Sequence, residues 1–177
     1  KVRNSSFSDL SGSAINNGRW ENFRVNFLFE GNTFEAVTDR LNFDDIYFTD
    51  GNQLQFINND FGTTGIYVEV HGERPDILLK GNESLSYINL RNVKDIESDS
   101  NRLSEYYYAN GNGAFSSERD TVRLGNNGGG TLWQIHNFTN AHIFKTATES
   151  GNYDTGLYMT NISSGRVSQV SFSGDNY

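Results

Sequence analysis

Hydrophobic and polar residues alternate along short stretches of this chain. Residues 25–29, 54–56 and 66–70 each place an aliphatic residue or Phe at every second position. Alternation with a period of two predicts β-strands that bury one face. Clusters of Asn and Gly that predict tight turns separate such stretches. These clusters lie at 16–18, 50–52, 81–82, 110–113 and 125–130.

The strand pattern recurs with a fixed spacing. Residues 2–7, 29–34 and 56–61 share a phrase in which an apolar residue, a polar stretch and a Phe follow one another, every 27 residues. Near the other end, residues 135–138 recur as 159–162, 24 residues further on. A unit of this size is too small to bury a face alone, so successive units must stack. The repeat predicts an all-β chain folded as a parallel β-solenoid with coils of about 24–27 residues; a β-sandwich with similar turns is the alternative.

The repeat also divides the chain into three parts. Residues 1–93 follow it closely and are expected to form solenoid coils. Residues 94–131 interrupt it, and we expect an irregular coil or an insertion there. Residues 132–177 are expected to form further coils or the start of an oligomerisation region. Because the chain begins at Lys1 without Met and both ends run into patterned sequence, we interpret it as a piece of a longer protein.

The composition supports this fold and excludes several partners. The chain has 177 residues, of which 23 are Asn and 18 are Gly, and both residue types favour turns over helices. Asn tolerates left-handed backbone angles, and stacked Asn side chains form hydrogen-bonded ladders. The absence of Cys excludes disulfides and thiolate metal sites. A net charge of -8 argues against nucleic acid and anionic membranes as partners, and no apolar run approaches the roughly 18 residues that span a bilayer.

The phrases at residues 2–7, 56–61 and 90–93 resemble coils of the right-handed parallel β-helix of pectate-lyase-like proteins and bacteriophage tailspikes. The resemblance covers residues 1–93 well and 132–177 moderately, and it carries no catalytic signature. It implies a carbohydrate-active protein, since this class contains polysaccharide lyases, endoglycosidases and phage proteins that bind or cut a surface glycan. The Asn-rich, Cys-free coils are more similar to the phage branch. That branch implies a side-by-side homotrimer, located outside the cell or on a virion tail.

A binding site is predicted from the 27-residue register, which places residues 27 apart one above the other at about 4.8 Å. Trp20, Tyr47 and Arg74 then form one column, and Asp44 and His71 lie in the next. Aromatic and hydrogen-bonding groups side by side suit a sugar, which has an apolar face and a rim of hydroxyls. We therefore predict that Trp20, Tyr47, His71 and Arg74 line a carbohydrate-binding groove. The alternative is that Trp20 and Tyr47 are stacked core aromatics.

Asp44 and Asp45 are the candidate catalytic residues. Hydrolysis of a glycosidic bond needs two carboxylates about 5–9.5 Å apart, and this pair interrupts an alternating pattern, which predicts a turn at the surface. A lyase would instead use a base such as His71 or Arg74, commonly with Ca²⁺. No other cofactor is expected, and the three His residues lack the spacing of a metal site.

Three functions follow from these observations. The first is a tailspike-like host-recognition protein that binds a cell-surface polysaccharide, with depolymerisation of that polysaccharide as an open alternative. The second is a free polysaccharide lyase or endoglycosidase. The third is a structural or adhesin solenoid without catalysis. Whether the chain is an enzyme stays open at this point.

Overall fold

The computed structural model describes most of the chain, with gaps in ten places. The described residues are 1–8, 15–16, 20–23, 26–35, 41–48, 53–72, 74–111, 120–130, 132–148 and 156–172. Within the strands, the side chains of 15–16, 20–23, 44–48, 71–72, 148 and 172 are not part of this description. No helix in the described residues is long and apolar enough to cross a membrane.

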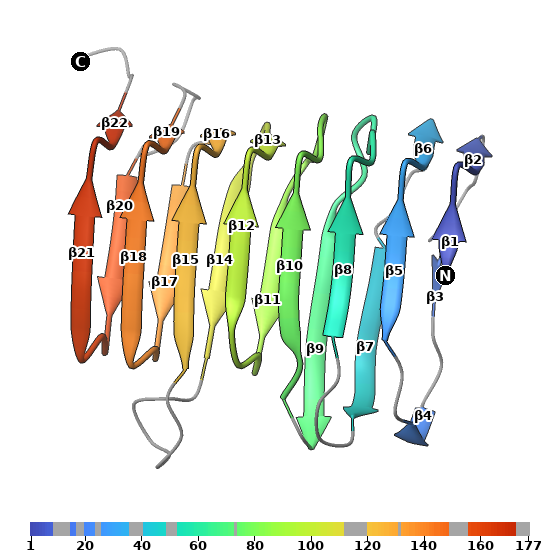
Figure 1. Ribbon diagram of the computed structural model, residues 1–177, viewed down its shortest axis with the longest axis horizontal. Helices are drawn as coiled ribbons and strands as arrows, with labels where there is room; N and C mark the ends of the chain where they lie inside the picture. Colours follow the sequence, from blue (N-terminus) through green and yellow to red (C-terminus); the bar gives the residue numbers. More distant parts are fainter. Residues whose placement is uncertain are drawn as a thin grey trace.

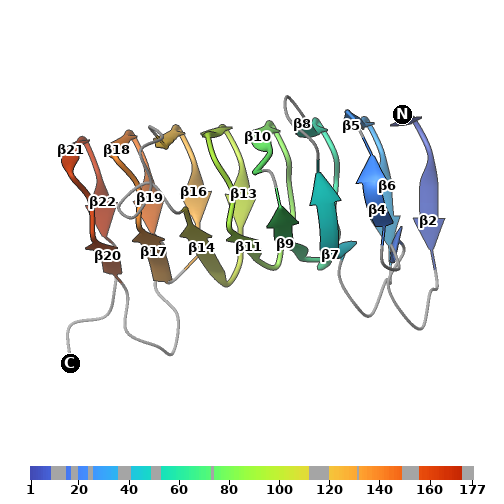
Figure 2. The same ribbon diagram turned by 90° about the horizontal axis from the view of Figure 1, so that it is seen from below.

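Parallel strands stack into long sheets that run the length of the molecule (Figures 1 and 2). Sheet I has eight strands: β1 (Val2–Arg3), β5 (Phe27–Glu30), β8 (Gln53–Ile57), β10 (Asp76–Lys80), β12 (Ile96–Asp99), β15 (Thr121–Gly125), β18 (Asn140–Phe144) and β21 (Ser164–Ser168). Sheet II contains β3 (Ile15–Asn16), β4 (Trp20–Phe23), β7 (Leu41–Phe48), β9 (Ile66–Gly72), β11 (Ile88–Arg91), β14 (Tyr106–Asn110), β17 (Leu132–His136) and β20 (Gly156–Thr160).

Short strands form a third side. They are β2 (Ser6–Ser8) paired with β6 (Thr33–Glu35), and the stack of β13 (Arg102–Leu103), β16 (Gly128–Gly129), β19 (Ala147–Thr148) and β22 (Ser171–Phe172). The chain visits sheet I, this short side and sheet II in turn, and each strand pairs in parallel with the equivalent strand of the next coil. The structure therefore confirms the predicted parallel β-solenoid.

Coil length varies more than the sequence repeat predicts. Along the buried asparagine ladder, successive residues are separated by 27, 23, 19 and 26 positions. The predicted range of 24–27 residues is therefore too narrow. A coil can shorten because the strands and the turn after sheet I fix its shape, while the connections between the sheets absorb the difference.

Like residues stack on like residues inside the solenoid. The rings of Phe7, Phe34 and Phe61 lie 4.9 and 5.0 Å apart in succession, nearly parallel. Phe29 stacks on Phe56 at 5.2 Å. The spacing matches the distance between strands, so each ring packs on the equivalent ring of the next coil. Such aromatic pairs add about 0.5–1.5 kcal/mol beyond the area that they bury.

A sharp turn follows each strand of sheet I. Its first residue has a positive φ in every coil, which suits Gly and Asn because they tolerate the left-handed region. These residues are Asn4, Gly31, Asn58, Gly81, Ser100, Asn126, Lys145 and Gln169. At Gly31 a β-carbon would lie 2.6 Å from the Asn4 side-chain oxygen, so Gly also gives room to the coil beside it.

A buried asparagine ladder follows this turn. Asn32, Asn59, Asn82, Asn101 and Asn127 are 0–2% exposed, and each of the first four donates its side-chain amide to the next one at 2.8–2.9 Å. The same side chains bond backbone carbonyls one coil away, as Asn101 does to Leu79 at 3.0 Å. The expected role of Asn in turns and ladders is confirmed.

The described parts of residues 94–131 continue the solenoid. Strand β12 pairs with β10 and β15, and β14 pairs with β11 and β17. Residues 112–119 and 131 lie outside the described residues. The predicted division of the chain into three parts stays a prediction.

Candidate functional site

Three of the residues predicted to bind carbohydrate lie on sheet II, but in other columns than expected. Tyr47 pairs with His71, whereas Trp20 pairs with Ile46. The predicted column of Trp20, Tyr47 and Arg74, and the pairing of Asp44 with His71, are therefore wrong. The reason is a shift of register between Phe43 and Ile46, in coils that are 24–26 rather than 27 residues long on this sheet. The side chains of Trp20, Tyr47 and His71 lie outside the described residues.

The candidate catalytic residues Asp44 and Asp45 lie within strand β7, which runs without a break from Leu41 to Phe48. They occupy the register shift between Phe43 and Ile46. The predicted surface turn is therefore wrong, because a bulge inside a strand also interrupts alternation. Their side chains lie outside the described residues, so their catalytic role stays a prediction.

Arg74, the fourth predicted binding residue, is turned into the protein. Its guanidinium forms an ion pair with Asp120, and the two side chains are 8% and 0% exposed. It also donates a hydrogen bond to the carbonyl of Val93 at 3.4 Å. A buried charge needs such a partner. The ion pair joins residues two coils apart, before β10 and β15, across the coil that contains Val93. Little of the Arg74 side chain is left to contact a ligand.

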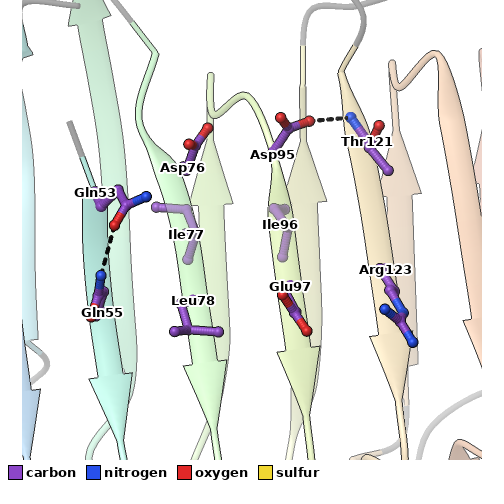
Figure 3. Close-up of a pocket in the computed structure, with 10 residues that line it drawn as sticks. All are labelled: Gln53, Gln55, Asp76, Ile77, Leu78, Asp95, Ile96, Glu97, Thr121 and Arg123. Atoms are coloured by element: carbon purple, nitrogen blue, oxygen red, sulfur yellow. Dashed lines mark hydrogen bonds between the residues drawn. The ribbon is translucent and has the colours of Figure 1, made fainter. Parts of the chain in front are cut away.

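A hollow opens instead on the outer face of sheet I (Figure 3). It has a volume of about 400 Å³ and crosses four neighbouring strands. We call it the sheet I groove. Its lining residues are Gln53 and Gln55 on β8, Asp76, Ile77 and Leu78 on β10, Asp95, Ile96 and Glu97 at β12, and Thr121 and Arg123 on β15.

The alternation within each strand brings the polar side chains to this face. On β10 and β12, Ile77 and Ile96 are 2% exposed and point into the core, where they pair in register. Their neighbours Asp76, Leu78 and Glu97 consequently face outwards. Leu78 lies opposite Glu97, and so an apolar side chain is set among hydrogen-bonding groups.

Asp76 and Asp95 lie side by side at one end of the groove, one coil apart (Figure 3). Burial raises the pKa of the Asp76 carboxyl above its ordinary value of 3.8, and the nearby Asp95 carboxylate raises it further. Lys94 and a hydrogen bond from Gln53 oppose this rise in pKa. The pair therefore holds one carboxyl that accepts a proton more readily than an ordinary aspartate.

Hydrogen bonds hold several groups of the groove in place. The Gln55 side-chain amide donates to the Gln53 side-chain oxygen at 2.7 Å, and the backbone N–H of Thr121 donates to Asp95 at 2.8 Å (Figure 3). A site that is ordered before a ligand arrives loses less conformational entropy on binding.

The groove continues along the sheet beyond Arg123. A second hollow of about 200 Å³ shares Glu97 and Arg123 with the first and extends to Phe144. The Arg123 guanidinium lies over the Phe144 ring, 5.2 Å from its centroid. The two hollows together span five strands of sheet I, from β8 to β18.

The chemistry of this groove suits hydroxyl groups. Carboxylates accept hydrogen bonds from hydroxyls, amides both accept and donate, and an Arg donates several. The described residues contain no cluster of three or more acidic or His side chains that could hold a metal ion. The sequence prediction missed the groove because these residues recur at 19–26 positions, so a 27-residue spacing does not align them.

Comparison with protein-family models, with curated proteins and with solved structures finds no match to this chain. The class of this protein, a parallel β-solenoid, is therefore assigned from its fold alone. The function of the lateral groove is interpreted from the chemistry of its lining residues.

Proposed function

We propose that this solenoid binds a cell-surface polysaccharide in the sheet I groove. The observation that carries the proposal is a lateral hollow in which carboxylates, amides and an Arg surround Leu78, a half-buried aliphatic side chain that faces outwards. A pyranose ring presents an apolar face and a rim of hydroxyls, so it needs both kinds of contact. The hollow is open along the sheet towards Phe144, which suits a polymer better than a free small sugar.

The tailspike resemblance makes this proposal more specific. We propose a host-recognition protein of the tailspike kind, located outside the cell or on a virion tail and assembled as a homotrimer. A free lyase or endoglycosidase and a structural or adhesin solenoid are the rival functions. Light scattering tests the assembly. The mass of a trimer supports the proposal of a tailspike-like protein, whereas the mass of a monomer contradicts that proposal and leaves the proposal of glycan binding in the sheet I groove unchanged.

Binding is tested by screening the purified protein on an array of bacterial surface polysaccharides. We expect one glycan family to bind the wild type and Arg123→Ala to bind it at least tenfold more weakly. Arg166→Ala is the matched control, since Arg123, His142 and Arg166 follow one another in the same outward row but Arg166 lies outside the hollows. Binding to no glycan, or equal losses in both variants, would contradict the proposal.

Hydrolysis is a second candidate function of the same groove. The pair of Asp76 and Asp95 favours it, because a carboxyl with a raised pKa beside a second carboxyl is the arrangement of a general acid and its partner. Strands one coil apart are separated by about 4.8 Å, close to the carboxylate separation of retaining glycosidases, about 5–5.5 Å.

Hydrolysis is tested by the release of reducing ends from the glycan that binds. We expect Asp76→Asn and Asp95→Asn each to lower release at least a hundredfold while binding persists. Glu83→Gln, an exposed carboxylate outside the hollows, is the control. Release that is absent in the wild type would leave a binding protein without this activity. Release that is unchanged in both Asp variants would contradict the assignment of hydrolysis to this pair.

A further inference from the structure

The outer face of sheet II carries a column in which amides and tyrosines alternate. Asn42 pairs with Tyr67, Tyr67 with Asn89, and Asn89 with Tyr108. Tyr108 pairs with Gln134, and Gln134 with Tyr158. We call these six residues the tyrosine column. Because strands lie about 4.8 Å apart, its amides and its tyrosines each recur about every 9.6 Å.

Folding does not require this alternation. Several other columns of the solenoid stack like on like: the Phe stacks, the asparagine ladder, and the neighbouring pair Tyr87 and Tyr106, whose rings are parallel at 5.0 Å. A two-coil period over six strands differs from these columns, and it lies on a face that points away from the core. Tyr107, one residue before Tyr108, is fully buried and stacks on Trp133 at 4.7 Å, so core packing and column are separate.

The side chains beside the column hold it in place. The guanidinium carbon of Arg91 lies 5.6 Å from the ring centroids of both Tyr67 and Tyr108. Arg91 also donates to the Asn89 side-chain oxygen at 3.2 Å. The Tyr67 hydroxyl donates to Glu69, and so the column presents hydroxyls and amides at fixed positions.

The described outward-facing side chains of β9, β11, β14, β17 and β20 carry no net charge, although the chain as a whole carries -8. Among the described outward-facing side chains of β9, β11, β14, β17 and β20, only Glu69 and Arg91 are fully charged, and they lie 3.7 Å apart. Burial lowers the pKa of His136 below its ordinary value of 6.5, so its imidazole is neutral at pH 7. An uncharged polymer therefore matches this face electrostatically, whereas an anionic or cationic one does not.

We propose that the tyrosine column binds one linear, uncharged polysaccharide chain lying along the solenoid axis, with two sugars for every two coils. An extended chain of equatorially linked pyranoses turns over at each sugar and repeats every second one, at close to two strand spacings. Tyrosines then contact every second sugar, and the partly exposed amide of Gln134 bonds a hydroxyl of a sugar between them, while the buried Asn89 holds Arg91 in place. This inference rests on the proposal that the ligand is a polysaccharide, and it adds a second, extended contact surface to the sheet I groove.

The test uses isothermal titration with hexaoses of known shape. The extended probes are the β-1,4-linked hexaoses of glucose, N-acetylglucosamine and mannose; the α-1,4-linked glucose hexaose, which coils, is the mismatched probe. We expect an extended hexaose to bind at least tenfold more tightly than the coiled one, with an affinity little changed by salt. The column spans roughly 24 Å, so affinity is expected to rise from dimer to hexamer and then level off.

Variants distinguish binding by the tyrosine column from binding by neighbouring residues of sheet II. Tyr108→Phe combined with Gln134→Ala is expected to weaken binding of the extended hexaose about tenfold, through the loss of two hydrogen bonds. Tyr106→Phe, on the same strand β14 but outside the column, is the matched control and is expected to leave affinity within twofold. Thermal unfolding of each variant checks that the fold is intact.

The outcomes distinguish the two surfaces. Hexaose binding that is lost in Arg123→Ala but kept in the column variant would overturn this inference and leave the groove proposal standing. Equal affinity for extended and coiled hexaoses, or equal losses in the column variant and Tyr106→Phe, would also overturn it. Loss in the column variant alone supports it, whether or not the groove binds a glycan.

Discussion

The outer faces of sheets I and II are built by the same coils and yet differ in chemistry. On sheet I, the outward positions hold carboxylates, amides and an Arg around two connected hollows. On sheet II, they hold tyrosines and amides with one ion pair. Several interior columns stack like residues on like over successive coils, as the Phe stacks and the asparagine ladder do, whereas the outward positions of sheet I do not. The difference shows that the interior residues determine the coil structure, whereas the outward residues can vary and serve binding.

The largest loss of stability is expected in the asparagine ladder, because both sheets depend on it. Asn101→Ala removes the side-chain oxygen that accepts from the backbone and the side-chain amide of Asn82, at 3.1 and 2.8 Å. Each buried donor left without a partner costs about 1–3 kcal/mol, so we expect a loss of about 3–5 kcal/mol in the free energy of unfolding.

Denaturant unfolding measures this loss. Asn126→Gly is the control, because Asn126 is exposed and its positive φ of 54° suits Gly; its cost is expected to stay under about 1 kcal/mol. If Asn101→Ala costs no more than this control, the ladder does not hold the coils together.

A smaller loss is expected for Arg74, the predicted binding residue that the structure places inside. Arg74→Met deprives the buried Asp120 carboxylate of this guanidinium, and we expect a loss of about 3 kcal/mol. Arg74→Met combined with Asp120→Asn should recover part of that loss in the same unfolding experiment. A surface role in carbohydrate binding would instead leave stability unchanged and reduce affinity.

Asp76 tests whether the outer face of sheet I is built for function rather than for stability, because functional groups often lower the stability of a protein. Its raised pKa means that the folded state binds the proton more readily, so stability rises as pH falls through the folded pKa towards 3.8. Asp76→Asn is therefore expected to stabilise the protein at pH 7, by less than about 1 kcal/mol for a half-exposed group, and to remove this pH dependence. A destabilised variant at pH 7 would mean that the carboxylate is held by favourable contacts.

The smallest effect on stability is expected for His136 on sheet II. Because the pKa of His136 is lowered in the folded state, the unfolded chain takes up the proton first, and stability is lost as pH falls below about 6.5. His136→Gln should remove this component, which we expect to be under about 1 kcal/mol. Unfolding curves at pH 7 and pH 5.5 for both proteins measure it, and identical pH dependence would contradict the assignment.

The sequence predicts the solenoid because its core stacks like on like. Phe29 and Phe56 are one coil apart and appear in the sequence as a 27-residue repeat. The repeat of residues 135–138 at 159–162 is likewise confirmed, since Ile135 pairs with Met159.

The site was not predictable in the same way. The shift of register in β7 moves Tyr47 opposite His71, and no periodic signal marks such a bulge. The groove residues are polar, they differ from coil to coil, and Asp76 and Asp95 are separated by only 19 positions. Outward positions obey no stacking rule, so a repeat search cannot align them.

The most direct test of the central claim is an NMR titration with a hexasaccharide prepared from the polysaccharide that binds on the array. We predict shifts in the backbone amides of β8, β10, β12 and β15, and their loss in Arg123→Ala but not in Arg166→Ala. Shifts confined to the short strands or to the ends of the solenoid would contradict a binding groove on sheet I.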